Sequence, residues 1–320
     1  MTFIEKIKFL KEIIREALIV YNIHKNPIFE NNRLLGEILR NTHSIEKGLS
    51  LDNVRLGFGY KKIRDACLMV KMYYTNGGDM NLVQLKMFRD ALSQYVRFHK
   101  EKGFENEIIQ EVKALLDDIN LIIPSSNKET GGFTFFRKPY YSESEYATFE
   151  RLFKDRHSIR EFDHKPVDSL ILKRAIELAM RCPSACNRQC YRLYVIDHKL
   201  FYMLGDWVEG TGGFDKELDK LLIITGQLSV YRLSEQFQHV VSSSIFVAYL
   251  SMSLQANGIG ACVIQRNIFP NKKWEKIKQN FNISGDELPV CCIGIGNLKE
   301  ETKVPISNRL AYDEIVTVFE

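Results

Sequence analysis

The spacing of apolar residues divides the chain into two parts. From residue 1 to about residue 145, apolar side chains recur every three or four positions, as they do along one face of an α-helix. Such stretches cover residues 4–18, 82–95 and 108–119. The Asn-Gly-Gly-Asp sequence at residues 76–79 is a strong turn between two of them. This pattern predicts an all-helical N-terminal domain over residues 1–145.

From about residue 146 the pattern becomes mixed. Apolar runs of strand length predict β-strands at residues 191–196, 221–225, 261–265 and 289–296, and a further strand in the tail at 315–319. Helical spacing predicts helices at residues 167–178, 234–255 and 272–281. Strands that alternate with helices predict an α+β or α/β core for residues 146–320.

The composition is that of a globular protein. The 320 residues are 45% hydrophobic and 26% charged. The formal net charge of +4 is too small to indicate a nucleic-acid-binding protein, and allows only a modest preference for anionic ligands. No apolar run is long enough to span a bilayer.

The first 21 residues carry charges throughout, which excludes a secretory signal peptide. They could form an amphipathic helix that lies on a membrane or on a partner. We favour the simpler interpretation, a first helix packed on its own domain. Seven cysteines without a secretory context predict reduced thiols in a cytoplasmic protein.

Three of these cysteines, Cys182, Cys186 and Cys190, are spaced by four residues. On one helix they would form a face of thiolates, so an iron–sulfur protein is one hypothesis. Pro183 would interrupt that helix, however, and no fourth ligand is obvious. The short Cys-x₂-Cys pair usual in zinc sites is also absent. We therefore expect no metal, and we interpret Cys291 and Cys292 as small core residues.

Glycine-rich phosphate loops are not evident in the sequence. There is no Walker motif, and the Gly-Phe-Gly-Tyr-Lys sequence at 57–61 lacks the third glycine of a dinucleotide-binding turn. The flanks of the glycines at 210–213 match neither phosphate loop. These observations argue against a dinucleotide-binding fold.

Two polar segments carry the most information about function. The first, Arg-His-Ser-Ile-Arg at residues 156–160, places cations and a hydroxyl just before an amphipathic helix. The second, Pro-Ser-Ala-Cys-Asn-Arg-Gln at 183–189, is a polar turn between that helix and a strand. Taken alone, the first segment could be an ordinary charged loop at a helix entry. Its value lies in the order of elements that follow it.

This order resembles the flavin-binding pattern of the nitroreductase family. In the family, a long helix later ends in a glycine-rich turn, a strand and a flavin-contacting loop follow, and an arginine near the C-terminus binds phosphate. Residues 257–260, residues 262–266 and Arg309 match these features. The resemblance covers residues 146–320 and implies an α+β fold, with a three-layer core around a central mixed sheet.

The resemblance also implies an FMN cofactor and the residues that bind it. Arginine forks and a hydroxyl suit the phosphate dianion, and a cation suits the flavin edge that becomes negative on reduction. Arg156, Ser158 and Arg309 would bind the phosphate with His157 beside them, and Arg160 would lie at the flavin edge. The turn would contribute Pro183, Ser184, Ala185, Asn187 and Gln189, and the later loop would contribute Val263, Ile264, Gln265 and Arg266.

In the family the turn belongs to the second subunit, because FMN lies at a dimer interface. The resemblance therefore implies a homodimer with the helix at 234–255 at its centre. The chain departs from the family pattern at three places. Cys-Tyr follows Gln189 where Pro-Trp is usual, the loop at 263–266 lacks the proline, acid and glycine of several members, and Ser307 stands where a second C-terminal cation is expected.

The activity implied is that of a cytoplasmic, FMN-dependent oxidoreductase. NAD(P)H would reduce the flavin and leave, and a small-molecule acceptor would then take the electrons in a ping-pong reaction. No side chain need act as an essential acid or base, because the flavin carries the chemistry. The alternative is a non-catalytic dimeric scaffold or partner-binding protein built on the same core.

The N-terminal half has a polar cluster of its own at residues 40–49. His43 and Glu46 could form an acid/base pair near the flavin. We favour a structural interpretation, in which Thr42 or Ser44 caps a short helix that Gly48 ends. Such an extension also resembles that of nitroreductase-like proteins associated with bacterial surface-polysaccharide synthesis.

Overall fold

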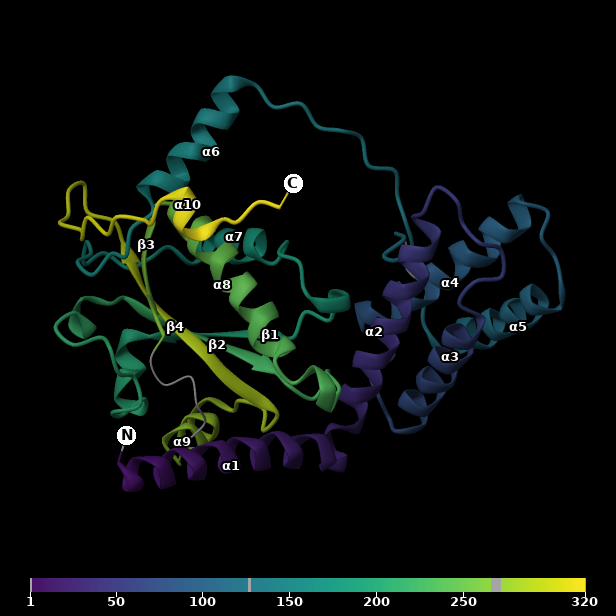
Figure 1. Ribbon diagram of the computed structural model, residues 1–320, viewed down its shortest axis with the longest axis horizontal. Helices are drawn as coiled ribbons and strands as arrows, with labels where there is room; N and C mark the ends of the chain where they lie inside the picture. The colour runs from purple at the N-terminus through teal and green to yellow at the C-terminus, as the bar shows by residue number, and fades with distance from the viewer. Residues whose placement is uncertain (1, 126–127, 266–271, 320) are drawn as a thin grey trace.

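A computed structural model describes residues 2–125, 128–265 and 272–319. The N-terminal half is helical, as predicted, and its helices are α1 (Phe3–Lys25), the 3₁₀ turn η1 (Pro27–Phe29), α2 (Glu30–Leu49), α3 (Tyr60–Thr75), α4 (Val83–Glu101) and α5 (Glu107–Ile122). Helices α2–α5, hereafter the helical bundle, enclose a hydrophobic core of their own that includes Ile38, Phe88 and Tyr95. The bundle stands to one side of the remaining structure (Figure 1).

The interpretation of residues 40–49 as a capped short helix is wrong. Helix α2 runs without a break from Glu30 to Leu49. Thr42 is buried inside it and donates a hydrogen bond to the Ile38 carbonyl, 2.8 Å away, rather than capping a new helix. Gly48 is also within α2, and a Cβ there would lie 2.0 Å from the Phe58 ring. Close packing against Phe58 therefore explains this glycine.

Helix α1 packs its apolar side chains on the second half of the chain and not on the core of the bundle, contrary to the favoured interpretation of the sequence. Its last turns contact the other half of the molecule, where Ile23 is buried with Leu228 and Leu288. His24 Nε2 lies 3.1 Å from the carbonyl oxygen of Tyr231 in the same region. Along the sequence, the bundle therefore lies between α1 and the core, although α1 packs directly on that core in the fold.

An extended linker leads from the bundle to the second half of the chain (Figure 1). The elements that follow are α6 (Glu143–Asp155), α7 (Ser169–Ala179), η2 (Ala185–Asn187), β1 (Tyr191–Asp197), η3 (His198–Met203), η4 (Asp215–Glu217), β2 (Lys220–Gln227), η5 (Leu233–Glu235), α8 (Gln238–Ala256), β3 (Ile259–Ile264), α9 (Lys272–Phe281), β4 (Glu287–Asn297) and α10 (Tyr312–Ile315). Four of the five predicted strands and all three predicted helices are present.

The sheet has the strand order β1-β2-β4-β3. All neighbouring strands among the described residues are antiparallel, so the predicted mixed sheet is wrong. The reason lies in the position of β4. Strands β2 and β3 are parallel to each other and are joined through α8, but β4 lies between them and pairs antiparallel with both.

The sheet has helices on both faces, which gives the expected three-layer α+β core. On one face, α7 and α8 pack through side chains such as Leu172, Phe246 and Leu250. On the other face, α9 contributes Trp274 and Ile277, which pack with Trp207. Cys291 and Cys292 are neighbours on β4 and point to opposite faces, so both are core residues as predicted.

Two element boundaries differ from the sequence-based expectation. Helix α8 begins at Gln238 rather than at residue 234, because residues 233–235 form a 3₁₀ turn in which Glu235 accepts a hydrogen bond from the Arg232 N–H. The tail at 315–319 is not a strand in the described structure. Its one regular element is the single turn α10, and its apolar side chains are exposed. No described helix is long and apolar enough to cross a membrane.

Candidate functional site

The segment Arg156–Arg160 is fixed alongside the outer edge of β3. Helix α6, which begins with a capping box between Ser142 and Glu145, ends at Asp155, and the chain becomes extended at Arg156. The Ile159 N–H then donates a hydrogen bond to the Ala261 carbonyl at 3.0 Å. The Ile159 side chain is buried, so its neighbours Ser158 and Arg160 are held at the surface.

This segment presents hydrogen-bond donors that the described residues do not satisfy. The half-buried side chains of Arg156 and Ser158 make no hydrogen bond or ion pair within the described parts of the chain. Among the described residues, Arg160 donates only to the Ser158 carbonyl, at 3.3 Å, and its guanidinium lies 5.9 Å from the Phe214 ring. Nδ1 of His157 lies 2.9 Å from the Asp155 carbonyl oxygen. Two free donors and a neighbouring cation suit an anion.

The free edge of β3 adds a backbone donor. In an antiparallel strand the N–H and C=O of one residue point to the same side, and alternate residues share that side. The Ala261 carbonyl points to the outer edge, so the N–H of Val263 also points outward, away from β4. No backbone hydrogen bond to Val263 N–H from outside the sheet is described. Ile264 is buried, and Gln265 is exposed just beyond the strand.

The turn at residues 183–189 has a left-handed backbone at three non-glycine residues. The φ angles of Cys186, Asn187 and Gln189 are 51°, 53° and 47°. Ser184 Oγ accepts a hydrogen bond from the Gln189 N–H at 3.0 Å, and Gln189 Nε2 donates to Asn187 Oδ1 at 3.1 Å. The amide nitrogen of Asn187 remains available as a donor at the surface of the turn. Such backbone strain persists only where surrounding contacts enforce it.

Arg188 is the main anchor of this turn. Its side chain is fully buried and donates two hydrogen bonds to the carboxylate of Glu235, at 3.0 and 3.1 Å. The guanidinium also lies 4.7 Å from the centre of the Tyr231 ring. Burial raises the pKa of Glu235, but the hydrogen bonds from Arg188 and Arg232 lower it by more. The pKa of Glu235 therefore lies below its ordinary value. The sequence did not identify this pair, because its members are 47 residues apart.

Helix α2 of the bundle contacts the same region. It lies against η2 in the turn, and Gly36 approaches the backbone so closely that a Cβ would lie 2.0 Å from the Val230 carbonyl oxygen. Glu37 accepts two hydrogen bonds from Arg232, both at 2.6 Å. Helix α2 of the bundle therefore packs against the turn at residues 183–189.

The predicted cofactor-binding residues fall into two groups at opposite edges of the sheet. Residues 156–160 and 263–265 lie at the β3 edge, and residues 183–189 precede β1 at the other edge. Strands β1 and β3 are separated by three interstrand steps, roughly 14 Å. Within one chain, no described contact joins the two groups.

The remaining predicted site residues are less well placed. Arg309 is exposed in the C-terminal tail and donates to the carbonyl of Ser307, two residues away. No described contact joins it to Arg156. Arg266 lies outside the described residues.

His43 and Glu46 form a pair in the bundle, with Nδ1 and Oε2 3.6 Å apart. Glu46 also accepts a hydrogen bond from the Gly132 N–H at 3.2 Å. Burial raises the pKa of Glu46, and the Gly132 and His43 contacts only partly oppose that shift. The pair ties α2 to the linker, and no described contact connects it with either group of predicted cofactor-binding residues.

The three cysteines of the iron–sulfur hypothesis do not share a helix. Cys182 follows the end of α7, Cys186 lies in the left-handed part of the turn, and Cys190 is buried just before β1. Burial raises the pKa of both Cys182 and Cys190. Within the described residues, no group of three or more His, Cys, Asp or Glu side chains could hold a metal ion.

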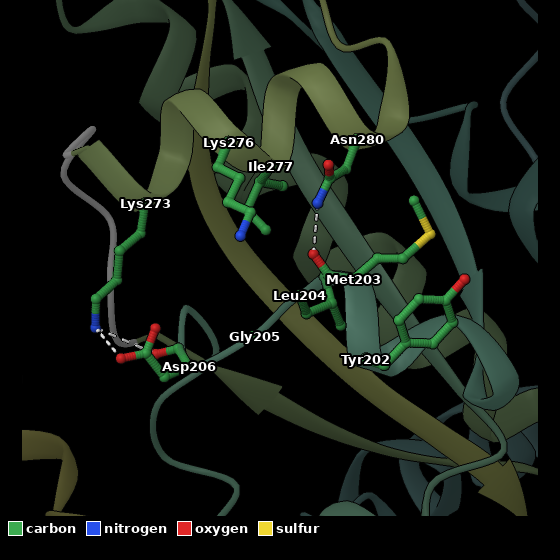
Figure 2. A pocket seen from close by; sticks show the side chains of 9 residues that line it. All are labelled: Tyr202, Met203, Leu204, Gly205, Asp206, Lys273, Lys276, Ile277 and Asn280. Carbon is green, nitrogen blue, oxygen red and sulfur yellow. Dashed lines mark hydrogen bonds and ion pairs between the residues drawn. The ribbon is translucent and has the colours of Figure 1, made fainter.

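Two cavities lie away from the predicted residues. One, of about 520 Å³, lies between η3 and α9, where Lys273 pairs with Asp206 at 2.8 Å and Asn280 donates to the Met203 carbonyl at 2.7 Å (Figure 2). The other, of about 850 Å³, lies in the bundle beside residues 49–56 and 133–136. Neither is lined by a predicted cofactor-binding residue.

Comparisons with known proteins agree with the resemblance in the sequence. Residues 153–212 match the model of the nitroreductase family. No curated protein matches the chain. Solved structures that it resembles include a nitroreductase family protein from Streptococcus pneumoniae, with 21% identity over 53% of this chain and 100% of that one and a TM-score of 0.45.

Two further structures are similar to a comparable extent. An FMN-dependent nitroreductase from Clostridium difficile has 21% identity over 52% of this chain and 96% of its own, with a TM-score of 0.44. A proposed NAD(P)H:FMN oxidoreductase from Staphylococcus epidermidis has 19% identity over 53% and 95%, with a TM-score of 0.46. The family match contains both the Arg156 segment and the turn that presents Asn187, so residues 153–212 are similar to the nitroreductase family over both of these motifs.

Proposed function

We propose that the protein is an FMN-dependent oxidoreductase that uses NAD(P)H to reduce a small-molecule acceptor. The observation that carries the proposal is the pair of free donors on Arg156 and Ser158, held beside the open edge of β3 within the segment that matches the family. A guanidinium and a hydroxyl in this arrangement fit the phosphate of FMN.

The chain's own residues would bind and orient the cofactor. Arg156 and Ser158 would hold the phosphate, and Arg160 would place a positive charge at the flavin edge. The outward N–H of Val263 and the amide of Asn187 would donate hydrogen bonds to the ring. When bound there, FMN supplies the hydride chemistry between NAD(P)H and the acceptor.

We propose further that the active form is a cytoplasmic homodimer in which each site combines the Arg156 segment of one chain with the Asn187 turn of the other. The separation of the two groups across the sheet supports this arrangement. So do exposed apolar side chains on α6 and α8, which contact each other. These side chains are Tyr146, Phe149 and Phe153 on α6, and Val241 and Tyr249 on α8. A second copy would remove this surface from water.

The first test is the visible absorption spectrum of the purified protein. A flavin spectrum that bleaches when NADH or NADPH is added without oxygen would support the proposal. The Arg156→Ala variant should retain FMN roughly ten- to hundredfold less tightly, because it loses charge-assisted hydrogen bonds. Arg174→Ala, a change at an exposed position on α7, is the matched control. Equal FMN affinity in both variants would contradict the assignment of Arg156.

Shared sites can be tested by mixing two defective chains. In a dimer of one Arg156→Ala chain and one Asn187→Gly chain, one site carries both changes and the other carries neither. Co-expression should therefore restore FMN binding to one site in two. If the mixed dimer binds no more FMN than the parents, both groups belong to one chain and the proposed arrangement is wrong.

The competing function is a non-catalytic dimeric scaffold, in which the bundle binds a partner. A colourless dimer that does not take up added FMN would favour it. The link to surface-polysaccharide metabolism stays a prediction, and it can be tested by offering the reduced protein oxidised sugar nucleotides as acceptors.

A further inference from the structure

Helix α1 has a long apolar face that nothing in the described structure covers. Along it, Phe3, Leu10 and Ile14 are 77%, 55% and 57% exposed. Only the last turns of the helix pack on the core, through Ile19, Val20 and Ile23. An isolated exposed apolar side chain is ordinary, but a contiguous row along several helical turns marks an interaction surface.

The charges on α1 are distributed unevenly around the helix. Glu5, Glu12 and Glu16 lie at helical spacing from Ile23, so they occupy the side that faces the core. The apolar residues cover about half of the circumference on the other side, at about 100° per residue. Exposed Lys6 and Lys11 lie within or beside this apolar face. The outer side of α1 is therefore apolar. It carries basic residues within or beside the apolar face, and its centre contains no glutamate.

Helix α9 adds positive charge next to α1. Helix α9 lies next to α1, on the side of α1 that faces the core (Figure 1), and a groove between them is lined by residues of both, including Ile19 and Lys278. Together their sequences contain nine lysines and arginines and four glutamates, a net charge of +5, whereas the whole chain carries +4. The excess positive charge of the protein thus lies on these two helices, although Lys273 is paired with Asp206 and Lys278 with Glu275. Their combined surface is hereafter called the α1–α9 face.

We propose that the α1–α9 face binds the surface of an anionic lipid bilayer, with α1 lying in the plane of the interface. An apolar face flanked by basic residues is the pattern of helices that insert partway into the headgroup region. Anionic lipids attract basic residues close to the surface, which complements the charge of this face. Neither helix needs to cross the membrane.

A second copy of the chain fits this face less well. The proposed dimer would bury α8, which packs on the opposite face of the sheet from α9, so the α1–α9 face would stay open. Two copies joined through this face would bring together two surfaces of net charge +5. The apolar arc of α1 is also wider than the narrow seam that a pair of coiled helices uses.

The test is sedimentation of the full-length protein with lipid vesicles. One set contains phosphatidylcholine alone, and the other an equimolar mixture with phosphatidylglycerol. We expect binding to the mixed vesicles that is at least roughly tenfold stronger than to the neutral ones, and that weakens between about 0.1 M and 1 M salt. Equal binding to both sets, or no binding, would overturn the proposal.

Paired variants locate the surface. The double change Leu10→Glu and Ile14→Glu should reduce binding to the mixed vesicles at least roughly tenfold. Leu121→Glu is the matched control, because Leu121 is 85% exposed on α5 of the bundle and should not affect vesicle binding. Unchanged melting temperatures would show that both variants fold. If the α1 double variant instead has a lower molecular mass than the wild type in light scattering without vesicles, α1 contacts a second copy of the chain. In that case the proposal fails. None of these measurements depends on FMN.

Discussion

Arg232 binds Glu37 through two hydrogen bonds of 2.6 Å, one to each carboxylate oxygen, across 195 residues of sequence. The pair joins α2 of the bundle to the loop before α8. The neighbouring Glu235 accepts hydrogen bonds from both the Arg232 N–H and Arg188. A short chain of ion pairs therefore runs from the bundle to the turn that presents Asn187.

We expect the Glu37→Gln variant to unfold more easily than the wild type at neutral pH, by about 0.5–1.5 kcal/mol. Burial raises the pKa of Glu37, but hydrogen bonds from Arg232 and Arg40 outweigh it, and the net pKa lies below its ordinary value of 4.5. The charged form thus stabilises the fold above pH 4.5, and that contribution is lost as the pH falls through the lower folded-state pKa.

Urea unfolding at several pH values measures this effect. The difference between wild type and Glu37→Gln should shrink as the medium becomes more acidic than the ordinary glutamate pKa. Glu30→Gln is the control, since in the described structure Glu30 pairs within α2, with Arg33 at 2.7 Å. A difference that does not change with pH would show that the Glu37 charge does not hold the bundle in place.

Gly36→Ala tests how closely α2 approaches the core. In a helix interior this change ordinarily stabilises a protein by about 1 kcal/mol. Here the new Cβ would meet the Val230 carbonyl oxygen at 2.0 Å, so we expect a loss of about 1–3 kcal/mol instead. Thermal unfolding shows directly whether Gly36→Ala raises or lowers the stability of the protein. Gly212→Ala should have little effect, because nothing lies within 4 Å of the added Cβ.

Two substitutions of Asn187 separate its backbone role from its side-chain role. Glycine tolerates the φ of 53°, so Asn187→Gly should keep its melting temperature but bind FMN more weakly. Asn187→Val should have a lower melting temperature and also bind FMN more weakly, because a β-branched residue is strained at this φ by about 1–2 kcal/mol. Calorimetry and FMN titration measure the two effects. Equal stability of the two variants would mean that the turn is not enforced by its surroundings.

A charge on α8 should separate the proposed dimer. Val241 is 49% exposed, and in a symmetric interface Val241→Glu would place two buried charges close together. We expect the molecular mass from light scattering to fall by half and FMN to be lost with it. Val83→Glu, at a 51% exposed position on α4, should leave both unchanged. If the Val241→Glu protein keeps its molecular mass and its FMN, the dimer interface does not include this part of α8.

Local patterns predicted most of the secondary structure correctly. The helix at 272–281 and the strand at 191–196 follow from apolar spacing, which depends only on near neighbours in the sequence. The arrangement of the sheet did not follow, because the insertion of β4 between β2 and β3 depends on contacts between distant segments. The tail at 315–319 was predicted as a strand because its residues favour that structure, but in the described chain no neighbouring strand pairs with it.

The same distinction applies to the candidate site. The sequence pattern located the Arg156 segment and the turn, since each is a short contiguous motif. It did not reveal that Arg188 is buried against Glu235, or that α2 lies behind the turn. Residue spacing also said nothing about the distance between the two motifs, which the order of the strands determines.

The placement of α1 has a consequence for how the protein responds to proteolysis. The linker between the bundle and α6 is exposed and contains Arg137, so trypsin should cut it readily after this residue. The amino-terminal fragment would still be held at two places, by α1 on the core near Leu228 and by Glu37 on Arg232. Nicked protein should therefore run as two bands on a denaturing gel and elute as one particle under native conditions. The bundle is therefore held to the core by contacts of α1 and of Glu37 near its N-terminal end, as well as by the peptide chain that trypsin cuts.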